Sequence, residues 1–374
     1  MSEHTFASTE VAPVEPPFRQ TPVPFLAELS DVNMLVRADD ARTHFNVDGS
    51  GCSAAILDTG LNVSHRDFAG RVRAVRNFTA DDGGDATIVH DPNGHGTNVA
   101  GIVCAGDIHK GMAPGSGIVG LKVLNNEGRG DFADVHRALE WVRDNAQELD
   151  ISAVCMSLGD ASNRQGDDDL SADALVAVFD DLVDLNVVCC VAAGNDFASH
   201  GSQQGMAYPA IIRSCISVGA VYDNNEGDQF YKRNGGAHAF STAPDRITPF
   251  SQRLHASVGQ DVATDIFAPG ALVTSTGNLT DFGSSTQQGT SQAAPVICGI
   301  VILLQSLHKR ETGRLPTVQQ VRSWLLTSAK TIHDGDDEDD NVVNTGLSYQ
   351  RVDAYAALTA CARELAMDET LPPG

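Results

Sequence analysis

The stretch Gly289-Thr290-Ser291-Gln292-Ala293-Ala294-Pro295 places a serine inside a turn of small residues, directly ahead of a long apolar helix. The helical pattern continues through residues 296–304, and Pro295 fits the first turn because the N–H that proline lacks has no intrahelical partner there. A helix N-terminus carries partial positive charge, which stabilises a negatively charged oxygen beside it. We therefore expect Ser291 to be a nucleophile.

Two further polar blocks lie upstream of this serine. Leu57-Asp58-Thr59-Gly60 ends an apolar run, and Asn93-Gly94-His95-Gly96-Thr97 opens a helix. In an open α/β sheet, reactive groups collect at the carboxyl ends of strands, and a carboxylate buried there needs a partner. We expect Asp58 to pair with His95, and His95 to take the proton of Ser291. Each residue alone is more common as a cap or turn residue, so the combination carries the prediction.

The rest of the chain predicts an α/β fold, a three-layer sandwich in which helices flank a mostly parallel central sheet. After residues 49–51, short apolar runs alternate with amphipathic segments, which is typical of parallel strands joined by crossover helices. The expected strands are 53–57, 118–124, 151–156, 186–192, 215–220 and 265–267, and the expected helices include 131–145, 171–185 and a closing helix at 349–366.

We expect one folded domain, residues 46–366, between an N-terminal extension at 1–45 and a short tail at 367–374. Residues 1–24 are rich in proline, threonine and glutamate without a hydrophobic period, which predicts a flexible tail. Within the domain, the polar insertion 222–246 either borders the predicted active site or is an ordinary loop. The acidic run 334–340 is solvated or holds a cation.

Composition excludes several classes of partner. Forty-nine acidic against 25 basic residues give a formal charge of -24, which repels nucleic acid and anionic lipid surfaces. The sequence contains no apolar run of about 20 residues, and its first residues lack the pattern of a signal peptide. Most of the eight cysteines lie in apolar runs, which predicts buried free thiols. These features favour the cytoplasm, with secretion by another route left open.

At all three blocks, in the order Asp, His, Ser, the chain resembles the subtilisin-like serine proteases, or subtilases, and is closest in type to the intracellular ones. The resemblance extends from about Gly51 to Leu358 and includes Val191-Ala192-Ala193-Gly194-Asn195. It implies that Asn195 and the Ser291 backbone N–H form an oxyanion hole. It also implies two substrate walls that a peptide joins as an added strand; they consist of Gly128, Arg129 and Gly130, and of Ser157, Leu158 and Gly159.

The chain departs from the family pattern at several places. Gln292 stands where methionine is usual and Asn98 where histidine is usual, and neither change removes a catalytic group. The stretch 105–111 is shorter than the loop that binds calcium in many subtilases. That difference argues against calcium there, while structural calcium elsewhere stays open, and no cofactor is expected to be required. The extension 1–45 resembles in length the short pro-segment of intracellular subtilases.

The resemblance implies a serine endopeptidase that works through an acyl-enzyme, either in general intracellular proteolysis or in processing a dedicated precursor. A catalytically silent peptide-binding protein is the alternative. A nucleotide-binding protein is a third option, weakened because no phosphate-cradling glycine motif follows the first strand. Residues 22–35 either lie across the active site as an inhibitor or are an ordinary tethered N-terminus. Asp160 and residues 167–169 would favour a basic residue before the scissile bond.

Overall fold

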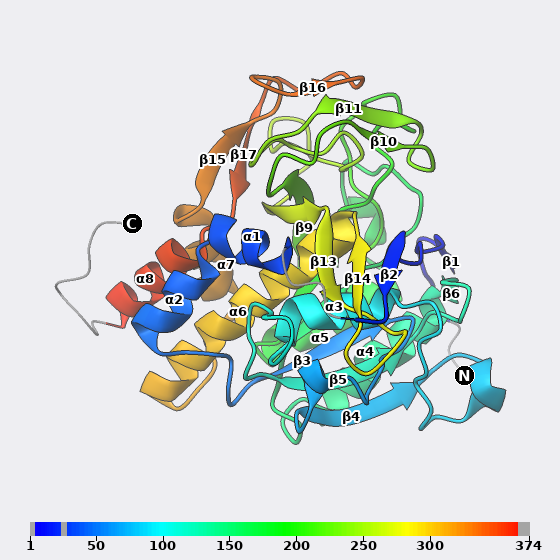
Figure 1. The fold of residues 1–374 in the computed structure, drawn as a ribbon, viewed down its shortest axis with the longest axis vertical. Coiled ribbons are helices and arrows are strands. Elements are labelled where there is room, and N and C mark those ends of the chain that lie inside the picture. The colour runs from blue at the N-terminus through cyan, green and yellow to red at the C-terminus, as the bar shows by residue number, and fades with distance from the viewer. Residues whose placement is uncertain (1–3, 24–27, 366–374) are drawn as a thin grey trace.

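A nine-stranded sheet runs through the middle of the molecule, and helices cover both of its faces (Figure 1). The computed structural model describes residues 4–23 and 28–365. In spatial order the strands are β15 (Lys330–His333), β17 (Ser348–Arg351), β12 (Ile266–Ala271), β9 (Ile216–Tyr222), β8 (Val188–Ala192), β7 (Ile151–Met156), β3 (Ser53–Asp58), β5 (Gly117–Lys122) and β4 (Val72–Asn77). Only the edge pair β15 and β17 is antiparallel.

The sheet separates two hydrophobic cores. One core contains residues of α1 (Glu28–Leu35), α2 (Ala38–Phe45), α3 (His95–Cys104), α6 (Thr290–Thr312), α7 (Val318–Thr327) and α8 (Ala354–Glu364), and the other contains residues of α4 (Phe132–Asn145) and α5 (Ala174–Asp184). Strand residues alternate between them: Ala54 and Ile56 belong to the first core, and Ala55 and Leu57 to the second. The predicted three-layer α/β architecture is confirmed.

Helix α6 crosses the first core directly beneath the sheet. It contacts β7, β8, β9 and β12, and it also packs against α3. By length and composition alone α6 could cross a membrane, contrary to the expectation that no segment is that long, but its most apolar window is entirely buried inside the fold. Because Ser291 lies in its first turn, the predicted nucleophile is anchored to the largest element of the core.

The predicted elements match the structure best where burial is greatest. Helix α4 begins directly after Asp131, whose side chain accepts a hydrogen bond from the backbone N–H of Ala133 as a helix cap. The closing helix is shorter than expected: α8 starts at Ala354, because the preceding residues form β17 at the sheet edge. Strand β4 was not predicted, since five of its six residues are partly buried or exposed and its sequence lacks a continuous apolar run.

Three smaller sheets surround the central one. They are β1 (Glu10–Val11) with β6 (Gly130–Asp131); β2 (Arg19–Thr21) with β14 (Ser284–Gln287) and β13 (Val273–Thr276); and β10 (Gln229–Tyr231) with β11 (Ala237–Ser241) and β16 (Asp339–Asp340). The described residues also contain three short 3-10 helices: η1 (Arg66–Phe68), η2 (Asp81–Gly84) and η3 (Asp168–Leu170).

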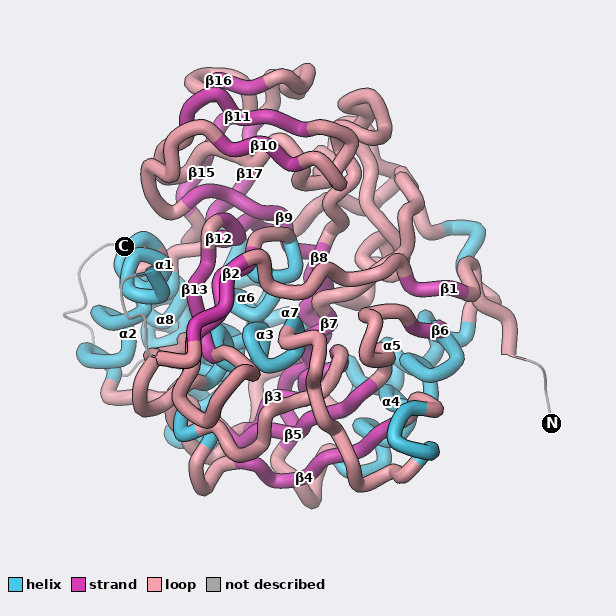
Figure 2. The backbone as a smooth tube through the Cα atoms, turned by 45° about the vertical axis from the view of Figure 1, so that its right-hand side comes forward, coloured by secondary structure: helices cyan, strands magenta, loops and turns pink. Residues whose placement is uncertain are grey.

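The N-terminal region corrects the prediction of a flexible tail for residues 1–24. Within the described residues, β1 pairs with β6 and β2 pairs with β14, and Figure 2 shows these strands at the two ends of a crossing over the molecule. The backbone N–H of Ala7 also donates to Asp173 at 2.6 Å. Prolines restrict φ, so this segment is extended rather than loose. Residues 1–3 and 24–27 lie outside the described residues, as does the predicted tail 367–374.

The insertion and the acidic run form one unit at the top of Figure 1. Strands β10 and β11 come from the insertion 222–246, and β16 comes from the acidic run and pairs with β11. The run is therefore not simply solvated. Asp334 is fully buried and forms an ion pair with the equally buried Arg253 at 3.1 Å, whereas Asp336 and Asp337 are exposed.

All eight cysteines are buried and none forms a disulfide. Burial raises the pKa of Cys104 to about 12 and also raises that of Cys52, so these thiols stay protonated at neutral pH. Because the thiolate is the reactive form, they are packing residues rather than nucleophiles.

Candidate active site

The carboxylate of Asp58 lies at the carboxyl end of β3 and is completely buried. Its Oδ1 atom accepts hydrogen bonds from the backbone N–H of Thr59 and from Nδ1 of His95, each at 2.7 Å. A carboxylate can only accept here, so Nδ1 of His95 carries the proton and Nε2 is left as the basic nitrogen. The predicted pairing of Asp58 with His95 is therefore present in the structure.

Two glycines around His95 are required by close packing. Gly94, with φ +89, precedes α3, and a Cβ there would lie 2.8 Å from Oδ1 of Asn278. A Cβ on Gly96 would lie 2.3 Å from the carbonyl oxygen of Gly60. The glycines thus let the His95 helix approach the turn after Asp58.

Asp91 is a supporting residue that the sequence analysis did not identify. Its buried carboxylate accepts hydrogen bonds from Gly94 N and Thr59 Oγ1 at 2.8 Å, and from the backbone and hydroxyl of Thr97 at 2.9 and 2.6 Å. Thr59 in turn accepts from Gly96 N at 2.9 Å. This network joins the strand that carries Asp58 to the helix that carries His95, and a helix N-terminus is a favourable place for its charge.

Ser291 occupies the first turn of α6, after Gly289 with φ +148. Its hydroxyl donates to the carbonyl oxygen of Ser157 at 3.2 Å rather than to His95, and the hydroxyl of Ser157 donates to the carbonyl oxygen of Ser291 at 2.6 Å. Catalytic hydrogen bonds are often loose or absent before substrate binds. Rotation of the Ser291 side chain is thus the step that would bring its hydroxyl to His95.

Asn195 lies in the loop after β8 and is oriented by the residue before the nucleophile. Its Oδ1 atom accepts hydrogen bonds from the backbone N–H and the hydroxyl of Thr290, at 2.8 and 2.9 Å. Because the amide oxygen is held in this way, the NH₂ group is the part left to donate elsewhere. Asn195 lines the same cleft as His95 and Ser291.

Gln292 and Asn98, the two departures from the family pattern, belong to one buried polar network behind the nucleophile. Nε2 of Gln292 donates to Oε1 of Gln287 at 2.9 Å and lies 3.5 Å from Oδ1 of Asn98. Gln287 in turn donates to the carbonyl oxygen of Gly94 at 3.4 Å. Through Gln287, Gln292 therefore links the helix of Ser291 to Gly94, the residue before His95.

His95, Asn195 and Ser291 share a cleft of about 490 Å³. Of the two predicted substrate segments, Ser157, Leu158 and Gly159 line the cleft, and Ser157 and Leu158 are buried. The other segment, Gly128 to Gly130, is not among the residues that line it; Gly130 lies in β6 and Gly128 has φ +76 at the turn before it. The side chain of Arg129 is exposed, and its backbone N–H donates to Asn125 at 2.9 Å.

The N-terminal segment occupies this cleft. We call residues 9–21 the cleft segment. Its backbone bonds to both predicted substrate segments: Ala12 N donates to the carbonyl oxygen of Gly159 at 2.8 Å, and Val14 N donates to that of Gly128 at 2.9 Å. Residues 12–18 line the cleft together with His95 and Ser291. An extended strand held by main-chain hydrogen bonds at a sheet edge is how proteases and many domains bind peptides.

Residues 9–21, rather than residues 22–35, occupy the cleft. Of the two alternatives for residues 22–35, the described ones fit the tethered N-terminus: Pro22 accepts a hydrogen bond from Thr280 beyond the cleft, at 3.0 Å. Helix α1 packs against β13 and α2, and Asn33 in this helix donates to the carbonyl oxygen of Lys110 at 2.8 Å. Helix α1 buries Leu29 and Val32 in the core and therefore packs against the body of the protein. The cleft segment is extended and contains several prolines, a form that can lie along a cleft.

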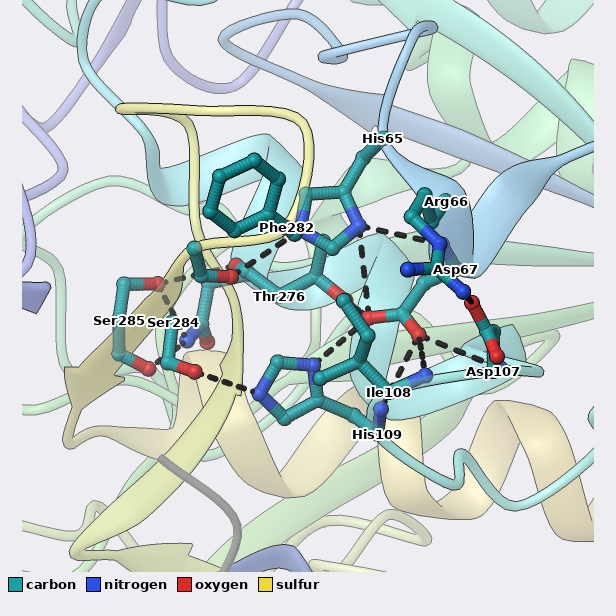
Figure 3. Close-up of polar contacts among 12 residues, drawn as sticks. His65, Arg66, Asp67, Asp107, Ile108, His109, Thr276, Phe282, Ser284 and Ser285 are labelled. Atoms are coloured by element: carbon teal, nitrogen blue, oxygen red, sulfur yellow. Dashed lines mark hydrogen bonds and ion pairs between the residues drawn. The ribbon is translucent and has the colours of Figure 1, made fainter. Parts of the chain in front are cut away.

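The shortened loop 105–111 is organised around Asp67, which is buried beneath it (Figure 3). The Asp67 carboxylate accepts hydrogen bonds from Ile108 N at 2.6 Å, His109 N at 3.0 Å, His109 Nδ1 at 2.6 Å and Thr276 Oγ1 at 2.8 Å. Burial alone would raise the pKa of Asp67, but the hydrogen bonds and charge of His109 lower it to about 2. Protein donors thus surround this carboxylate.

Comparison with known proteins agrees with this geometry. The model of the subtilase family matches residues 49–350. Serine protease AprX of Bacillus subtilis (strain 168) is 32% identical over 277 residues, which cover 68% of this chain and 57% of that protein. The major intracellular serine protease of the same organism is 29% identical over 284 residues, 75% of this chain and 76% of that protein. An intracellular serine protease of Paenibacillus polymyxa is 30% identical over 281 residues, 74% of each chain.

Proposed function

The chain belongs to the subtilase family of serine proteases, and on that premise we propose that it is an endopeptidase with Asp58, His95 and Ser291 as its catalytic triad. The observation that carries the proposal is the buried Asp58–His95 hydrogen bond at 2.7 Å, which lies in the same cleft as Ser291 at the start of α6. This arrangement supplies an orienting carboxylate, a base and a nucleophile.

Each group has one task in the proposed reaction. Ser291 Oγ attacks the scissile carbonyl carbon, and Nε2 of His95 accepts the hydroxyl proton. The oxyanion that forms accepts hydrogen bonds from the Asn195 amide and the Ser291 backbone N–H. The C–N bond then breaks, the amine leaves with the proton from His95, and an acyl-enzyme remains. In deacylation His95 takes a proton from water as the water oxygen attacks the ester carbon; the C–O bond to Ser291 then breaks, His95 returns the proton to the Ser291 oxygen, and the new carboxyl product leaves.

Labelling with a fluorophosphonate probe tests this proposal against the peptide-binding alternative. We expect Ser291 to be labelled in the wild type and the label to be lost in Ser291→Ala. If the wild type took no label while an authentic subtilase did, the silent peptide-binding protein would be the better description. The intact Asp58–His95 pair favours the enzyme, because a binding protein would not need a base beside the serine.

We propose an intracellular role, because two similar proteins are named intracellular serine proteases and eight free thiols suit a reducing compartment. The net charge of -24 argues against nucleic acid and anionic membranes as partners. General proteolysis and processing of a dedicated precursor both fit the open cleft walls. Digestion of casein, compared with cleavage of the product of a neighbouring gene, separates the two roles.

We also propose that the cleft segment inhibits the enzyme until it is displaced or cleaved. It bonds to Gly128 and Gly159, which are the edges that a substrate strand would need. A peptide cannot pair with those carbonyl groups while Ala12 and Val14 use them. Because the segment is tethered, its effective concentration at the cleft is high and does not fall on dilution.

We propose further that the loop 105–111 does not need calcium. The Asp67 carboxylate already receives hydrogen bonds from Ile108, His109 and Thr276, and it would have to give up these donors to bind a cation. Incubation with a chelator tests this. We expect the rate of heat inactivation to stay the same with excess chelator or added calcium. An acceleration by the chelator that persists in Asp337→Asn, which removes a carboxylate of the acidic run, would contradict the proposal.

A further inference from the structure

The charged side chains around the cleft point to a substrate preference that rests on the proposed endopeptidase function. The cleft segment enters like a substrate, with Ala12 and Val14 bonded to the two predicted substrate segments. The next residue, Glu15, forms an ion pair with Arg233. Arg233 belongs to the insertion 222–246, which forms the outer rim of the cleft through residues 230–234.

Arg233 and its neighbour Lys232 are the only lysine or arginine residues that line the cleft within the described part of the chain. Lys232 is exposed and forms no ion pair with any described residue. In a protein with 25 basic and 49 acidic residues, two adjacent cations at the mouth of the cleft are a distinct local positive charge. Removal of Glu15 with the cleft segment would leave both cations facing the incoming peptide.

The acidic residues expected to attract basic substrates are engaged elsewhere. Asp167 and Asp168 form ion pairs with Arg213, and Asp169 pairs with Arg164. None of the three lines the cleft.

The two acidic residues that do line the cleft wall are bound locally. Asp160 accepts hydrogen bonds from Ser162 N at 3.0 Å, Ser162 Oγ at 2.6 Å and Tyr208 N at 3.0 Å, and Asp196 accepts from Ser199 at 3.1 Å. These neutral donors hold both carboxylates against their own loops but do not remove their charge, so a preference for acidic substrates requires the attraction of Arg233 and Lys232 to outweigh them.

We infer that Arg233, with Lys232 beside it, selects substrates that carry aspartate or glutamate at the position that Glu15 occupies in the cleft segment. Glu15 of the cleft segment and an acidic residue of the substrate would then pair with the same side chain, Arg233. Arg233 would thus be a residue of the insertion that determines substrate specificity. Because the Arg233 and Glu15 side chains are 71% and 54% exposed, water and salt screen the attraction. We expect a preference of about three- to fivefold in kcat/KM, falling as salt is added.

A peptide library tests the inference directly. The library places Glu, Gln or Lys in turn at each position around the scissile bond. The ratio kcat/KM is measured for each peptide with the full chain and with the Val14→Pro variant. In this variant we expect the cleft segment to be bound less tightly. At one position Glu should exceed the isosteric Gln, and Lys should be the poorest. Arg233→Gln should abolish this order, and Arg233→Glu should invert it. Equal rates for the three residues, or an order that survives both substitutions, would overturn the inference.

A matched control and a reciprocal change keep the outcome unambiguous. Arg314→Glu makes the same change in net charge at an exposed site past the far end of α6, and it should leave the order intact. Glu15→Lys should raise the activity of the full chain, and Glu15→Lys combined with Arg233→Glu should lower it again. If no peptide is cleaved and no variant takes a fluorophosphonate label, the proposed function fails. Cleavage without a Glu preference removes only this inference.

Discussion

Ser291 and Ser157 exchange hydrogen bonds: the hydroxyl of each donates to the backbone carbonyl of the other, at 3.2 and 2.6 Å. The proposed nucleophile is thus tied to a predicted substrate segment. Only the hydroxyl of Ser291 must leave this arrangement for catalysis, and the hydroxyl of Ser157 then still holds the first turn of α6. Ser157 is completely buried, so its bond to the Ser291 carbonyl is shielded from water.

Replacement of Ser157 by alanine should therefore weaken both folding and catalysis. A buried carbonyl that loses its donor costs about 1–3 kcal/mol, and we expect the melting temperature and kcat to fall while KM changes little. Ser275→Ala is the matched control, because the Ser275 hydroxyl is buried without a hydrogen-bond partner. Equal loss in the two variants would show that the Ser157 contact has no special role.

Asn195→Asp separates the two tasks of Asn195. Aspartate keeps an oxygen for the backbone and hydroxyl of Thr290 but lacks the NH₂ donor. In subtilisin itself, loss of one such donor lowers kcat by about 10²- to 10³-fold, and we expect a fall of similar size here, with KM and the melting temperature nearly unchanged. A variant that instead retained kcat would remove Asn195 from the oxyanion hole. Steady-state kinetics on one peptide substrate provide the measurement.

Val14→Pro should relieve the proposed self-inhibition. Proline has no N–H, so the hydrogen bond from residue 14 to the carbonyl oxygen of Gly128 is lost. The initial activity of the full chain should rise severalfold, while the final activity after the segment has been cleaved should match that of the wild type. Val23→Pro places the same residue in the same region but beyond the cleft, and should act like the wild type. Progress curves distinguish the two variants.

Asp340→Asn should stabilise the protein at alkaline pH. Burial raises the pKa of Asp340 to about 6, above the ordinary value of 3.8, so the folded state disfavours its ionised form. The penalty is absent well below pH 4, where the carboxyl is protonated in both states; it grows between about pH 4 and pH 6 and is constant at higher pH. Because the residue is only partly buried, we expect a gain of about 1 kcal/mol at pH 8.

Denaturation by urea at pH 4 and pH 8 measures this difference. If the acidic run instead held a cation, the substitution would lower the stability at pH 8 in the presence of calcium. A loss of stability that was equal at both pH values would contradict the assignment to burial. The hydrogen bond from Val342 N to Asp340, at 3.0 Å, is retained in the variant because asparagine still has an acceptor oxygen.

Asp67→Asn should cost more stability than any of the preceding changes. An amide presents only one oxygen to the donors on Ile108, His109 and Thr276, and its NH₂ group would face some of them. Removal of one partner of such a buried pair costs about 3–5 kcal/mol. Because the pKa of Asp67 is lowered to about 2, the difference between wild type and variant should be complete above pH 4 and shrink towards pH 2. Thermal denaturation across this range is the measurement.

The sequence predicts most of the central parallel strands and the pairing of Asp58 with His95 for a physical reason. Strands such as β3 and β7 are buried on both faces and therefore read as continuous apolar runs, and the Asp131 cap marks the start of α4. The hydrogen bond between Asp58 and His95 follows from their places at the end of a strand and the start of a helix.

The N-terminal segment could not be predicted in the same way. Strands β1 and β2 contain two and three residues, and each exists because of a partner more than 100 residues away, at Gly130–Asp131 and Ser284–Gln287. No pattern within residues 1–24 indicates a strand partner that far away in the sequence, and the prolines of this segment favoured a flexible tail instead. The roles of Asp91 and Ser157 were missed for a related reason, since a lone Asp or Ser in a loop has no distinctive spacing.

The short strands β6 and β14 receive their partners from the cleft segment, so its departure would leave two open backbone edges on an active enzyme. Open edges pair readily with any extended chain, including the N-terminus of another molecule. Activation would therefore expose the protein to association with itself as well as to its substrates. The charge of -24 opposes such association, because it makes every copy repel every other.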